Sequence, residues 1–371
     1  MRNDKRPVII AGARPNFVKV APLIRAFDAA NVPAYLVHTG QHYDEALSLS
    51  LFRDLGMRQP DVNFGVGSGS HAAQTARVMT SFDDWVDNHP VSEVIVVGDV
   101  NSTVACALVA AKRGIPVAHV EAGLRAFDRT MPEEVNRIVT DALATWLLTP
   151  SADANANLIR EGIGEDRIFL VGNIMVDSLE DALLRLPERT VVQELGLSGG
   201  GYVLVTLHRP AMVDDSIRLE AMLRALAVLS DRLPVIFPVH PRTRARIDDL
   251  SLTLPPNLHL VMPMTYLDFV AAQAGARLVV TDSGGVQEET TCLGVTCLTA
   301  RDNTERPITI TEGTNTLVGT DPSVVLDAAL GALDRAVVPR RPPLWDGRTA
   351  ERVVAALTEH RPSASWFGPT P

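Results

Sequence analysis

The sequence predicts an α/β protein built from two Rossmann-like, doubly wound domains that face a central cleft. Short apolar runs alternate with longer amphipathic runs, as in parallel sheets whose strands are joined by helical crossovers. That alternation pauses at Leu186–Gly201, which contains proline and a glycine-rich run, and then begins again. The 371 residues also suit two cores better than one. We therefore expect one domain over residues 1–186, a second over 187–350, and a C-terminal helix and tail over 351–371 that packs back on the first domain.

The first half contains apolar runs typical of strands and amphipathic runs typical of helices. The expected strands are Val8–Ala11, Ala34–His38, Val94–Val97, Val117–Val120 and Ile168–Val171. The expected helices include Val18–Ala30, Ala72–Asp87, Ser102–Lys112 and Glu133–Ala144. Before the last of these, Pro132 has a first-turn position where proline is tolerated, and two glutamates follow it near the positive end of the helix dipole.

The second half repeats the pattern. The expected strands are Val203–Thr206, Val235–Pro238, Leu258–Val261, Leu278–Thr281 and Cys297–Thr299. Helices are expected between them, such as Ser216–Ser230 and Gly285–Leu293. Two successive α/β halves of similar size imply two doubly wound domains.

The composition is that of an ordinary globular protein and argues against several function classes. A net charge of −10 disfavours nucleic-acid binding, which needs a basic face. No window approaches the roughly 18 uninterrupted apolar residues of a membrane span, and the N-terminal residues lack the apolar stretch of a signal peptide. Cys106, Cys292 and Cys297 form neither a CxxC pair nor a metal-ligand spacing. We expect a reduced, cytoplasmic setting with no metal, no membrane and no nucleic-acid partner.

The turn after the first strand, residues 12–16, carries cations. Ligands of open α/β sheets bind at the carboxyl ends of the strands, so this turn is expected at a ligand site. It is not a G-x-G-x-x-G loop, and we therefore expect no dinucleotide cofactor. It offers Arg14, and Lys19 follows along the next helix. Two cations there suit a diphosphate, although both could instead be surface charges.

Three carboxylates stand beyond strands of the first half. Asp99 follows the strand at Val94–Val97, Glu121 directly follows Val117–Val120, and Glu133 opens a helix. Carboxylates that share one site move each other's pKa values apart, which lets one acid and one base coexist. Asp99 could instead cap a helix, and Glu133 could serve the helix dipole. Glu121 has the weakest structural explanation, because the strand needs neither a cap nor a charge there.

Two histidines follow strands of the second half. His208 comes after Val203–Thr206 and could donate to a phosphate or a sugar, or act as an acid–base group. His240 follows the next strand along the chain, and we interpret it as structural.

The sharpest local pattern is T-D-S-G-G-V-Q-E-E at residues 281–289. A strand ends, two glycines leave backbone N–H groups accessible, and a helix begins, which is typical of an anion-binding turn. Ser283 with the N–H groups of Gly284 and Gly285 could hold a phosphate. Glu289 could accept hydrogen bonds from both ribose hydroxyls, and Arg306 offers another cation.

Seven motifs occur together and in order: G-A-R-P-N, G-D-V-N-S-T, H-V-E-A-G-L-R, M-P-E-E-V-N-R, H-R-P, T-D-S-G-G-V-Q-E-E and T-E-R-P. They resemble the motifs of non-hydrolysing UDP-N-acetylglucosamine 2-epimerases of bacteria and archaea. The resemblance extends from about Val8 to about Gly319. It implies the glycosyltransferase-B fold, a homodimer, and a nucleotide bound mainly by the second domain.

The resemblance also implies a reaction on a UDP-sugar without a cofactor. The C2 proton of the sugar is not acidic, so the family is thought to eliminate UDP across C1 and C2. This leaves 2-acetamidoglucal, to which UDP adds again with protonation on the other face. Carried over by motif, the catalytic set is Asp99, Glu121, Glu133 and His208. The UDP-binding set is Arg14, Lys19, Ser283, Gly284, Gly285, Glu289 and Arg306.

Two departures from the family pattern leave alternatives open. After His208 and Arg209 the family usually has x-Glu-Asn, whereas here Pro210 is followed by Ala211 and Met212. This keeps another UDP-2-acetamido sugar, such as a diacetamido uronic acid, as a candidate substrate. A hydrolysing epimerase, a retaining glycosyltransferase and a non-catalytic UDP-sugar sensor are further alternatives. Residues 41–44 and 69–75 also differ from those of the allosterically regulated members, so we expect no requirement for UDP-N-acetylglucosamine as an activator.

Overall fold

The structure, a computed structural model, describes residues 5–40, 51–186, 191–335 and 338–360 and contains two compact units. Unit 1 is formed by the residues up to Ser178 together with those from Pro343 onwards, and unit 2 is Leu179–Pro342. The sequence analysis placed these boundaries at residues 186 and 350. The chain instead leaves unit 1 inside helix α7 (Ile174–Leu183), and residues 343–350 belong to unit 1 with α16 (Thr349–Glu359).

The sheet of unit 1 is parallel, with the strand order β3-β2-β1-β4-β5-β6-β7. Its strands are β1 (Arg6–Ala11), β2 (Tyr35–His38), β3 (Val62–Asn63), β4 (Val91–Val97), β5 (Val117–Val120), β6 (Trp146–Thr149) and β7 (Ile168–Leu170). The register pairs Val8 with Tyr35 on one side of β1 and with Val94 on the other. Because β2 and β4 flank β1, the strand order reverses direction between β1 and β4, which is the switch point of a doubly wound sheet.

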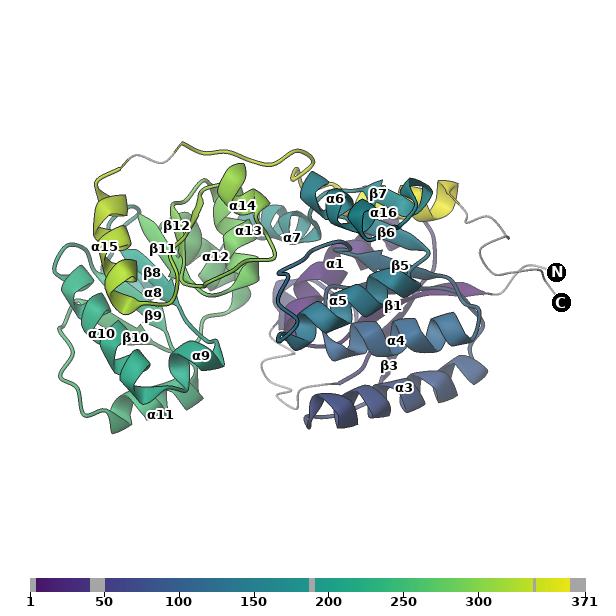
Figure 1. Ribbon diagram of the computed structural model, residues 1–371, viewed down its shortest axis with the longest axis horizontal. Coiled ribbons are helices and arrows are strands. Elements are labelled where there is room, and N and C mark those ends of the chain that lie inside the picture. Colours follow the sequence, from purple (N-terminus) through teal and green to yellow (C-terminus); the bar gives the residue numbers. More distant parts are fainter. Residues whose placement is uncertain (1–4, 41–50, 187–190, 336–337, 361–371) are drawn as a thin grey trace. The chain divides into compact units, whose positions relative to one another are not determined.

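The helices of unit 1 cover both faces of its sheet. They are α1 (Arg14–Ala29), α3 (His71–Asp87), α4 (Asn101–Lys112), α5 (Pro132–Leu143), α6 (Ala152–Arg160) and α16, with a short 3₁₀ turn η1 (Glu165–Arg167). Helices α3, α4 and α5 lie side by side on one face, and α1 lies beside α16 on the other (Figure 1). Val8, Ile10 and Val94 pack with Val78 and Phe82 of α3 in one buried cluster, as the two-residue period of a strand requires.

The chain's return to unit 1 is held by buried polar contacts. Asp177 accepts hydrogen bonds from the backbone N–H groups of Thr349 (3.0 Å) and Ala350 (2.7 Å), the first residues of α16. These donors have no partner inside the helix, so a carboxylate there acts as its cap. The indole of buried Trp345 donates to the carbonyl of Pro150 over 3.0 Å. Residues from Pro343 onwards are therefore an integral part of unit 1.

Unit 2 repeats the design with the parallel order β10-β9-β8-β11-β12-β13. Its strands are β8 (Val203–Thr206), β9 (Val235–Pro238), β10 (Leu258–Val261), β11 (Leu278–Thr281), β12 (Cys297–Thr299) and β13 (Asn315–Leu317). Its helices are α8 (Val191–Glu194), α9 (Pro210–Val213), α10 (Ser216–Ser230), α11 (Pro241–Asp249), α12 (Tyr266–Ala274), α13 (Gly284–Leu293), α14 (Ile308–Thr311) and α15 (Pro322–Leu333). Here the switch point lies between β8 and β11.

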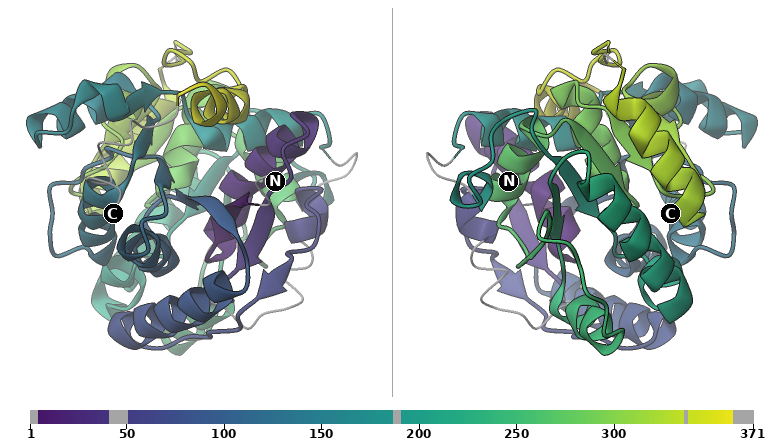
Figure 2. Two further views of the ribbon diagram at one scale, coloured as in Figure 1. Left: turned by 90° about the vertical axis from the view of Figure 1, so that its right-hand side faces the viewer. Right: turned by 90° about the vertical axis from the view of Figure 1, so that its left-hand side faces the viewer.

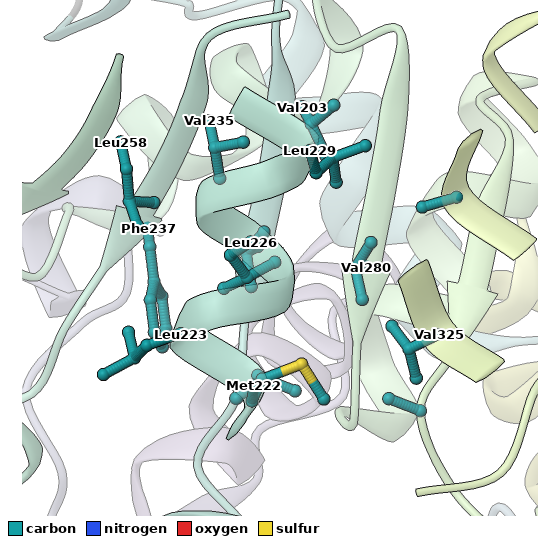
Figure 3. Packing of buried hydrophobic residues seen from close by; sticks show 14 of the residues in the cluster. Val203, Met222, Leu223, Leu226, Leu229, Val235, Phe237, Leu258, Val280 and Val325 are labelled. Atoms are coloured by element: carbon teal, nitrogen blue, oxygen red, sulfur yellow. The ribbon is translucent and has the colours of Figure 1, made fainter. Parts of the chain in front are cut away.

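Helix α10 shows how local sequence builds this core. Asp215 caps it by accepting from the N–H groups of Ile217 and Arg218, and apolar residues recur on one face at three- and four-residue spacing. That face packs with Val325 and its neighbours on α15 against β8, β9, β10 and β11 (Figure 3). The right-hand view of Figure 2 shows α10 and α15 running next to each other. The alternate residues Tyr202 and Leu204 face the opposite cluster, which includes residues of α12 and α13.

Most predicted elements are confirmed, with ends shifted by a few residues. The five strands predicted in the second half have the predicted bounds. Helix α1 begins at Arg14 rather than Val18, because Pro15 is tolerated in a first turn and Asn16 supplies the start with a hydrogen bond to Ala13 N–H. Strands β3, β6 and β13 were not predicted. The expectation about allosteric activation rests partly on residues 41–44, which lie outside the described residues.

Candidate active site

In unit 1, the turns after β1 and β4 meet at the switch point. The amide of Asn16 donates to the carbonyl of Val97 over 3.0 Å and so joins the two turns. A Cβ added to Gly12 would lie 2.9 Å from Ser102 Cβ at the start of α4, so only glycine fits there. Arg14 is the first residue of α1, but its side chain lies outside the part of the chain that the structure describes.

Glu121 lies directly beyond β5 and pairs with Lys19 of α1. The Lys19 ammonium is 2.5 Å from Glu121 Oε2, and both side chains are buried. Glu121 has a φ of 70°, a left-handed conformation that is unfavourable for a non-glycine residue. Its Oε1 is buried and has no hydrogen-bond partner among the described residues. The structure therefore brings together a residue predicted to bind UDP and one predicted to be catalytic.

Asp99 is held by Arg137, a residue that the sequence analysis did not select. The Asp99 carboxylate forms an ion pair with Arg137 Nη1, and its backbone carbonyl accepts from Asn136 Nδ2 over 2.9 Å. Arg137 is buried and also pairs with Glu134 at 2.6 Å. The Asp99 side chain is still one-quarter exposed, so a ligand can reach it.

The two glutamates at the start of α5 have different environments. Glu134 is buried and accepts from the backbone N–H groups of Ala126 (3.0 Å) and Phe127 (2.9 Å). Glu133 is exposed, and within the described ranges no recorded hydrogen bond or ion pair involves its side chain. Glu134 is therefore structural, whereas Glu133 is available to a ligand.

In unit 2, His208 and Asp282 meet at the second switch point. His208 Nδ1 is 2.7 Å from Asp282 Oδ1, and the backbone N–H groups of His208 and Arg209 also donate to this carboxylate. Burial raises the pKa of Asp282, but the hydrogen bonds from His208 and from the two backbone groups outweigh it and hold the pKa below its usual value. Asp282 orients the largely exposed imidazole of His208. Asp282 was missed although it directly follows a strand, as Glu121 does.

The anion-binding turn lies at the N-terminus of α13. Ser283 is the N-cap residue, and its hydroxyl makes no capping hydrogen bond. The first N–H groups of a helix have no partner within it, so those of Gly284 and Gly285 can donate to an anion. Arg306 is buried close by, with its Nε 2.8 Å from Glu288 and its Nη1 paired with Glu305. The predicted cation is thus fixed beside the turn by two carboxylates.

Gly284 packs directly against that cation. A Cβ added there would lie 2.6 Å from Arg306 Nη1 and 3.0 Å from Glu305 Oε1. Because both carboxylates restrain Arg306, we expect Gly284→Ala to lower the free energy of unfolding by about 1–3 kcal/mol, the usual effect of overpacking, and to weaken UDP binding. Gly331→Ala in α15 is the control: nothing lies within 4 Å of the added Cβ, and we expect a gain of about 0.5–1 kcal/mol. Urea unfolding measures the stability of both variants, and equal effects on stability would contradict the packing argument.

The remaining candidates of unit 2 are Glu289, Met212 and His240. Glu289 is buried and accepts a hydrogen bond from Gln273 Nε2 over 2.6 Å. Burial raises the pKa of Glu289 to about 7. Met212, beside the predicted sugar site, instead packs in the core of unit 2. His240 caps α11 through its Nδ1, in agreement with its structural interpretation.

Comparisons with known proteins identify the family. The family model described as UDP-N-acetylglucosamine 2-epimerase matches residues 25–358. The chain belongs to this family. A UDP-N-acetylglucosamine 2-epimerase of Methanocaldococcus jannaschii is 39% identical over 359 residues, which cover 94% of this chain and 98% of the relative. A UDP-2,3-diacetamido-2,3-dideoxy-D-glucuronate 2-epimerase of Pseudomonas aeruginosa is 36% identical over 355 residues, with 94% and 98% covered.

Solved structures agree with this epimerase family and its fold. The crystal structure of the M. jannaschii UDP-GlcNAc 2-epimerase in complex with UDP-GlcNAc and UDP superposes with a TM-score of 0.86 at 37% identity, over 95% of this chain and 99% of that chain. A UDP-glucosyltransferase from Polygonum tinctorium is similar in fold alone, with a TM-score of 0.56 at 13% identity over 95% and 98% of the two chains. The predicted α/β class with glycosyltransferase-B likeness is confirmed.

The described part of this epimerase-family chain is residues 5–40, 51–186, 191–335 and 338–360. No helix there is long and apolar enough to cross a membrane. In the same ranges, His, Cys, Asp and Glu side chains form no group of three or more that could hold a metal ion.

Proposed function

We propose that this chain is a non-hydrolysing epimerase that interconverts UDP-N-acetylglucosamine and UDP-N-acetylmannosamine. UDP is eliminated across C1 and C2 to leave 2-acetamidoglucal, and it adds again after protonation at C2 from the other face. Family membership supports a UDP-sugar 2-epimerase. The anion-binding turn of α13 holds the diphosphate, and the carboxylates of unit 1 carry the proton transfers.

The observation that carries this proposal is the environment of Glu121. A buried carboxylate oxygen without a hydrogen-bond partner is unfavourable by about 1–3 kcal/mol, so it is retained where a ligand completes it. Oε1 of Glu121 is such an atom, and Lys19 holds the other oxygen at 2.5 Å. An oriented carboxylate with one uncommitted oxygen is suited to accept a proton from a carbon acid. Asp99 and Glu133 are the further candidates, one for each face of the sugar.

A proton NMR time course with UDP-N-acetylglucosamine in deuterated water tests the reaction. We expect UDP-N-acetylmannosamine to form. Deuterium should appear at C2 of this product and of the remaining UDP-N-acetylglucosamine, because C2 exchanges its proton with solvent during the reaction. Release of free N-acetylmannosamine with UDP would identify a hydrolysing enzyme instead. Binding of the UDP-sugar without any exchange at C2 would identify a sensor. Transfer of the sugar with no deuterium at C2 would identify a transferase.

A second substrate is supported by one comparison. The P. aeruginosa relative, named for a diacetamido glucuronate sugar, is almost as similar as the M. jannaschii relative. Met212, however, is 2% exposed and belongs to the core of unit 2, so its apolar character serves packing. We therefore favour UDP-N-acetylglucosamine. Running the same time course with UDP-2,3-diacetamido-2,3-dideoxyglucuronate compares the two through kcat/KM, and a higher value for the second sugar would reverse this choice.

We propose further that the chain acts as a homodimer through an apolar surface of unit 1. Phe127 is 69% exposed, with Arg160 stacked over its ring at 5.9 Å, and Val135 is 45% exposed. Val139 lies one helical turn after Val135 on α5, and both are exposed on the same face. Exposed apolar residues gathered in this way are typical of protein interfaces.

Val135→Glu combined with Val139→Glu is expected to convert the dimer to a monomer of 40.0 kDa. Charges on an apolar interface lose solvation without gaining partners. Sedimentation velocity measures the mass. Ile217→Glu, at an 81% exposed apolar position of unit 2, is the control and should leave the dimer intact. A double variant that still sediments as a dimer would exclude this surface.

A further inference from the structure

His119, in the middle of β5, has hydrogen-bond acceptors at both ring nitrogens. Its side chain is fully buried, with Nδ1 2.6 Å from Asp141 Oδ1 and Nε2 2.9 Å from the carbonyl oxygen of Gly98. An imidazole has two N–H groups only when it is protonated. A neutral ring would direct a lone pair at one of these two oxygens. The geometry therefore requires an imidazolium.

The buried charges beside His119 are tied to Asp141. Asp141 also pairs with Arg125 Nη1 at 2.7 Å, and Arg125 Nη2 pairs with Glu161 at 2.7 Å. The Glu161 side chain is 37% exposed, so the buried pair of Asp141 with Arg125 is balanced by itself, and the protonation of His119 follows from its two acceptors. Burial raises the pKa of Asp141, but the interactions with His119 and Arg125 outweigh it and hold the pKa below its usual value.

The His119–Asp141 pair holds two turns of the candidate active site. The Gly98 carbonyl that accepts from His119 immediately precedes Asp99. The second oxygen of Asp141 accepts from the backbone N–H of Gly123 over 3.1 Å, two residues after Glu121. Glu121 has a φ of 70°, which is unfavourable for a non-glycine residue, so its turn adopts a backbone conformation that needs support from its surroundings.

We infer that His119 and Asp141 are positioning residues for the epimerase reaction, because they fix the turns that carry Asp99 and Glu121. This inference rests on the proposed function, since it assumes that those carboxylates react. A Cβ added to Gly98 would lie 3.2 Å from Lys19 Nζ and 3.3 Å from Glu121 Oε2, so the peptide that His119 holds is in contact with the ion pair. Displacement of this peptide changes the position of both carboxylates together.

Two amide variants separate the two hydrogen bonds of His119. The amide nitrogen of His119→Gln reproduces the position of Nε2 and can still donate to Gly98, whereas that of His119→Asn reproduces Nδ1 and reaches only Asp141. We expect His119→Asn to lower kcat by about 10²-fold, as for a reacting group displaced by about 1 Å, and His119→Gln to retain clearly more. KM and the calorimetric UDP affinity should stay unchanged, because unit 2 supplies the anion-binding turn. His89→Gln, which removes a half-buried histidine of the same unit, is the control and should keep wild-type kcat.

Nitrogen-15 NMR of histidine-labelled wild-type protein tests the protonation state of His119 directly. The signals of His119, assigned by their loss in His119→Gln, should show both ring nitrogens protonated. A neutral tautomer would overturn the inference, as would wild-type kcat in both amide variants or equal loss in both. If the wild-type chain does not epimerise UDP-N-acetylglucosamine, the proposed function fails, and the NMR result still decides whether the imidazolium is present.

Discussion

Glu121→Gln is expected to lower kcat by about 10²–10⁴-fold, the range usual for the loss of a general acid or base. The amide keeps the shape of the side chain but cannot accept a proton, and it replaces the carboxylate that pairs with Lys19 at 2.5 Å. UDP affinity should change little, because the anion-binding turn belongs to unit 2. Steady-state rates with UDP-N-acetylglucosamine and calorimetry with UDP measure the two quantities.

Asp99→Asn and Glu133→Gln should lower kcat by a similar factor of about 10²–10⁴. Glu134→Gln is the matched control for Glu133, one residue away on α5. It should lower the melting temperature instead, because buried Glu134 pairs with Arg137 and holds the N–H groups of Ala126 and Phe127. Near-wild-type kcat in Asp99→Asn, Glu121→Gln and Glu133→Gln would show that these carboxylates are not the acid–base groups.

Glu289→Gln is expected to make the protein more stable at alkaline pH while weakening nucleotide binding. Burial raises the pKa of Glu289 from 4.5 to about 7, so the folded state binds this proton more tightly than the unfolded state does. The contribution of Glu289 to the free energy of unfolding is therefore fully present below about pH 4.5 and is lost as the pH rises through 7. The loss is on the order of 3 kcal/mol. The variant cannot ionise at this position. Its free energy of unfolding should equal that of the wild type below about pH 4.5 and exceed it by that amount above pH 7.

The affinity of the wild type for UDP should change with pH in the direction opposite to its stability. If ionised Glu289 accepts hydrogen bonds from the ribose, the affinity of the wild type falls as the pH drops below about 7. The variant should bind UDP more weakly by about 1.5–3 kcal/mol per lost charged hydrogen bond, with no such pH dependence. Glu312→Gln, at an exposed position of the same unit, should change neither quantity. Urea unfolding and calorimetry at pH 5 and pH 8 measure both, and UDP affinity that Glu289→Gln leaves unchanged would exclude the ribose role.

The sequence predicted the elements whose pattern is local. Strand β11 is a short continuous apolar run and helix α10 has an apolar period of about 3.6 residues, and both were predicted with their bounds. Strand β13 was not, because Asn315 and Thr316 lack the pattern of a strand and pair with β12 only in the folded sheet. Strand β6 was also missed, although it is wholly buried between β5 and β7.

Residues of the candidate site could be predicted where they follow a strand. Residues whose place in the site depends on a partner distant in the sequence were harder to predict. Asp99, Glu121 and Ser283 follow strands, so the rule for open sheets selects them. Arg137 lies in the second turn of α5, and its contact with Asp99 spans 38 residues of sequence. The pairing of Lys19 with Glu121 spans 102 residues. Such partners depend on the register of the sheet and on helix packing, which no local pattern encodes.

The capping of α16 by Asp177 has a consequence for the order in which the protein can fold during synthesis. Unit 2 is one continuous segment that ends at Pro342, so the ribosome has supplied all of it before the last part of unit 1 exists. Unit 1 lacks Trp345 and the N–H groups of Thr349 and Ala350 until then, and Asp177 is left without these donors. The domain that begins at the N-terminus is therefore the last to be completed, and a nascent chain released before α16 carries an unfinished first unit beside a complete second one.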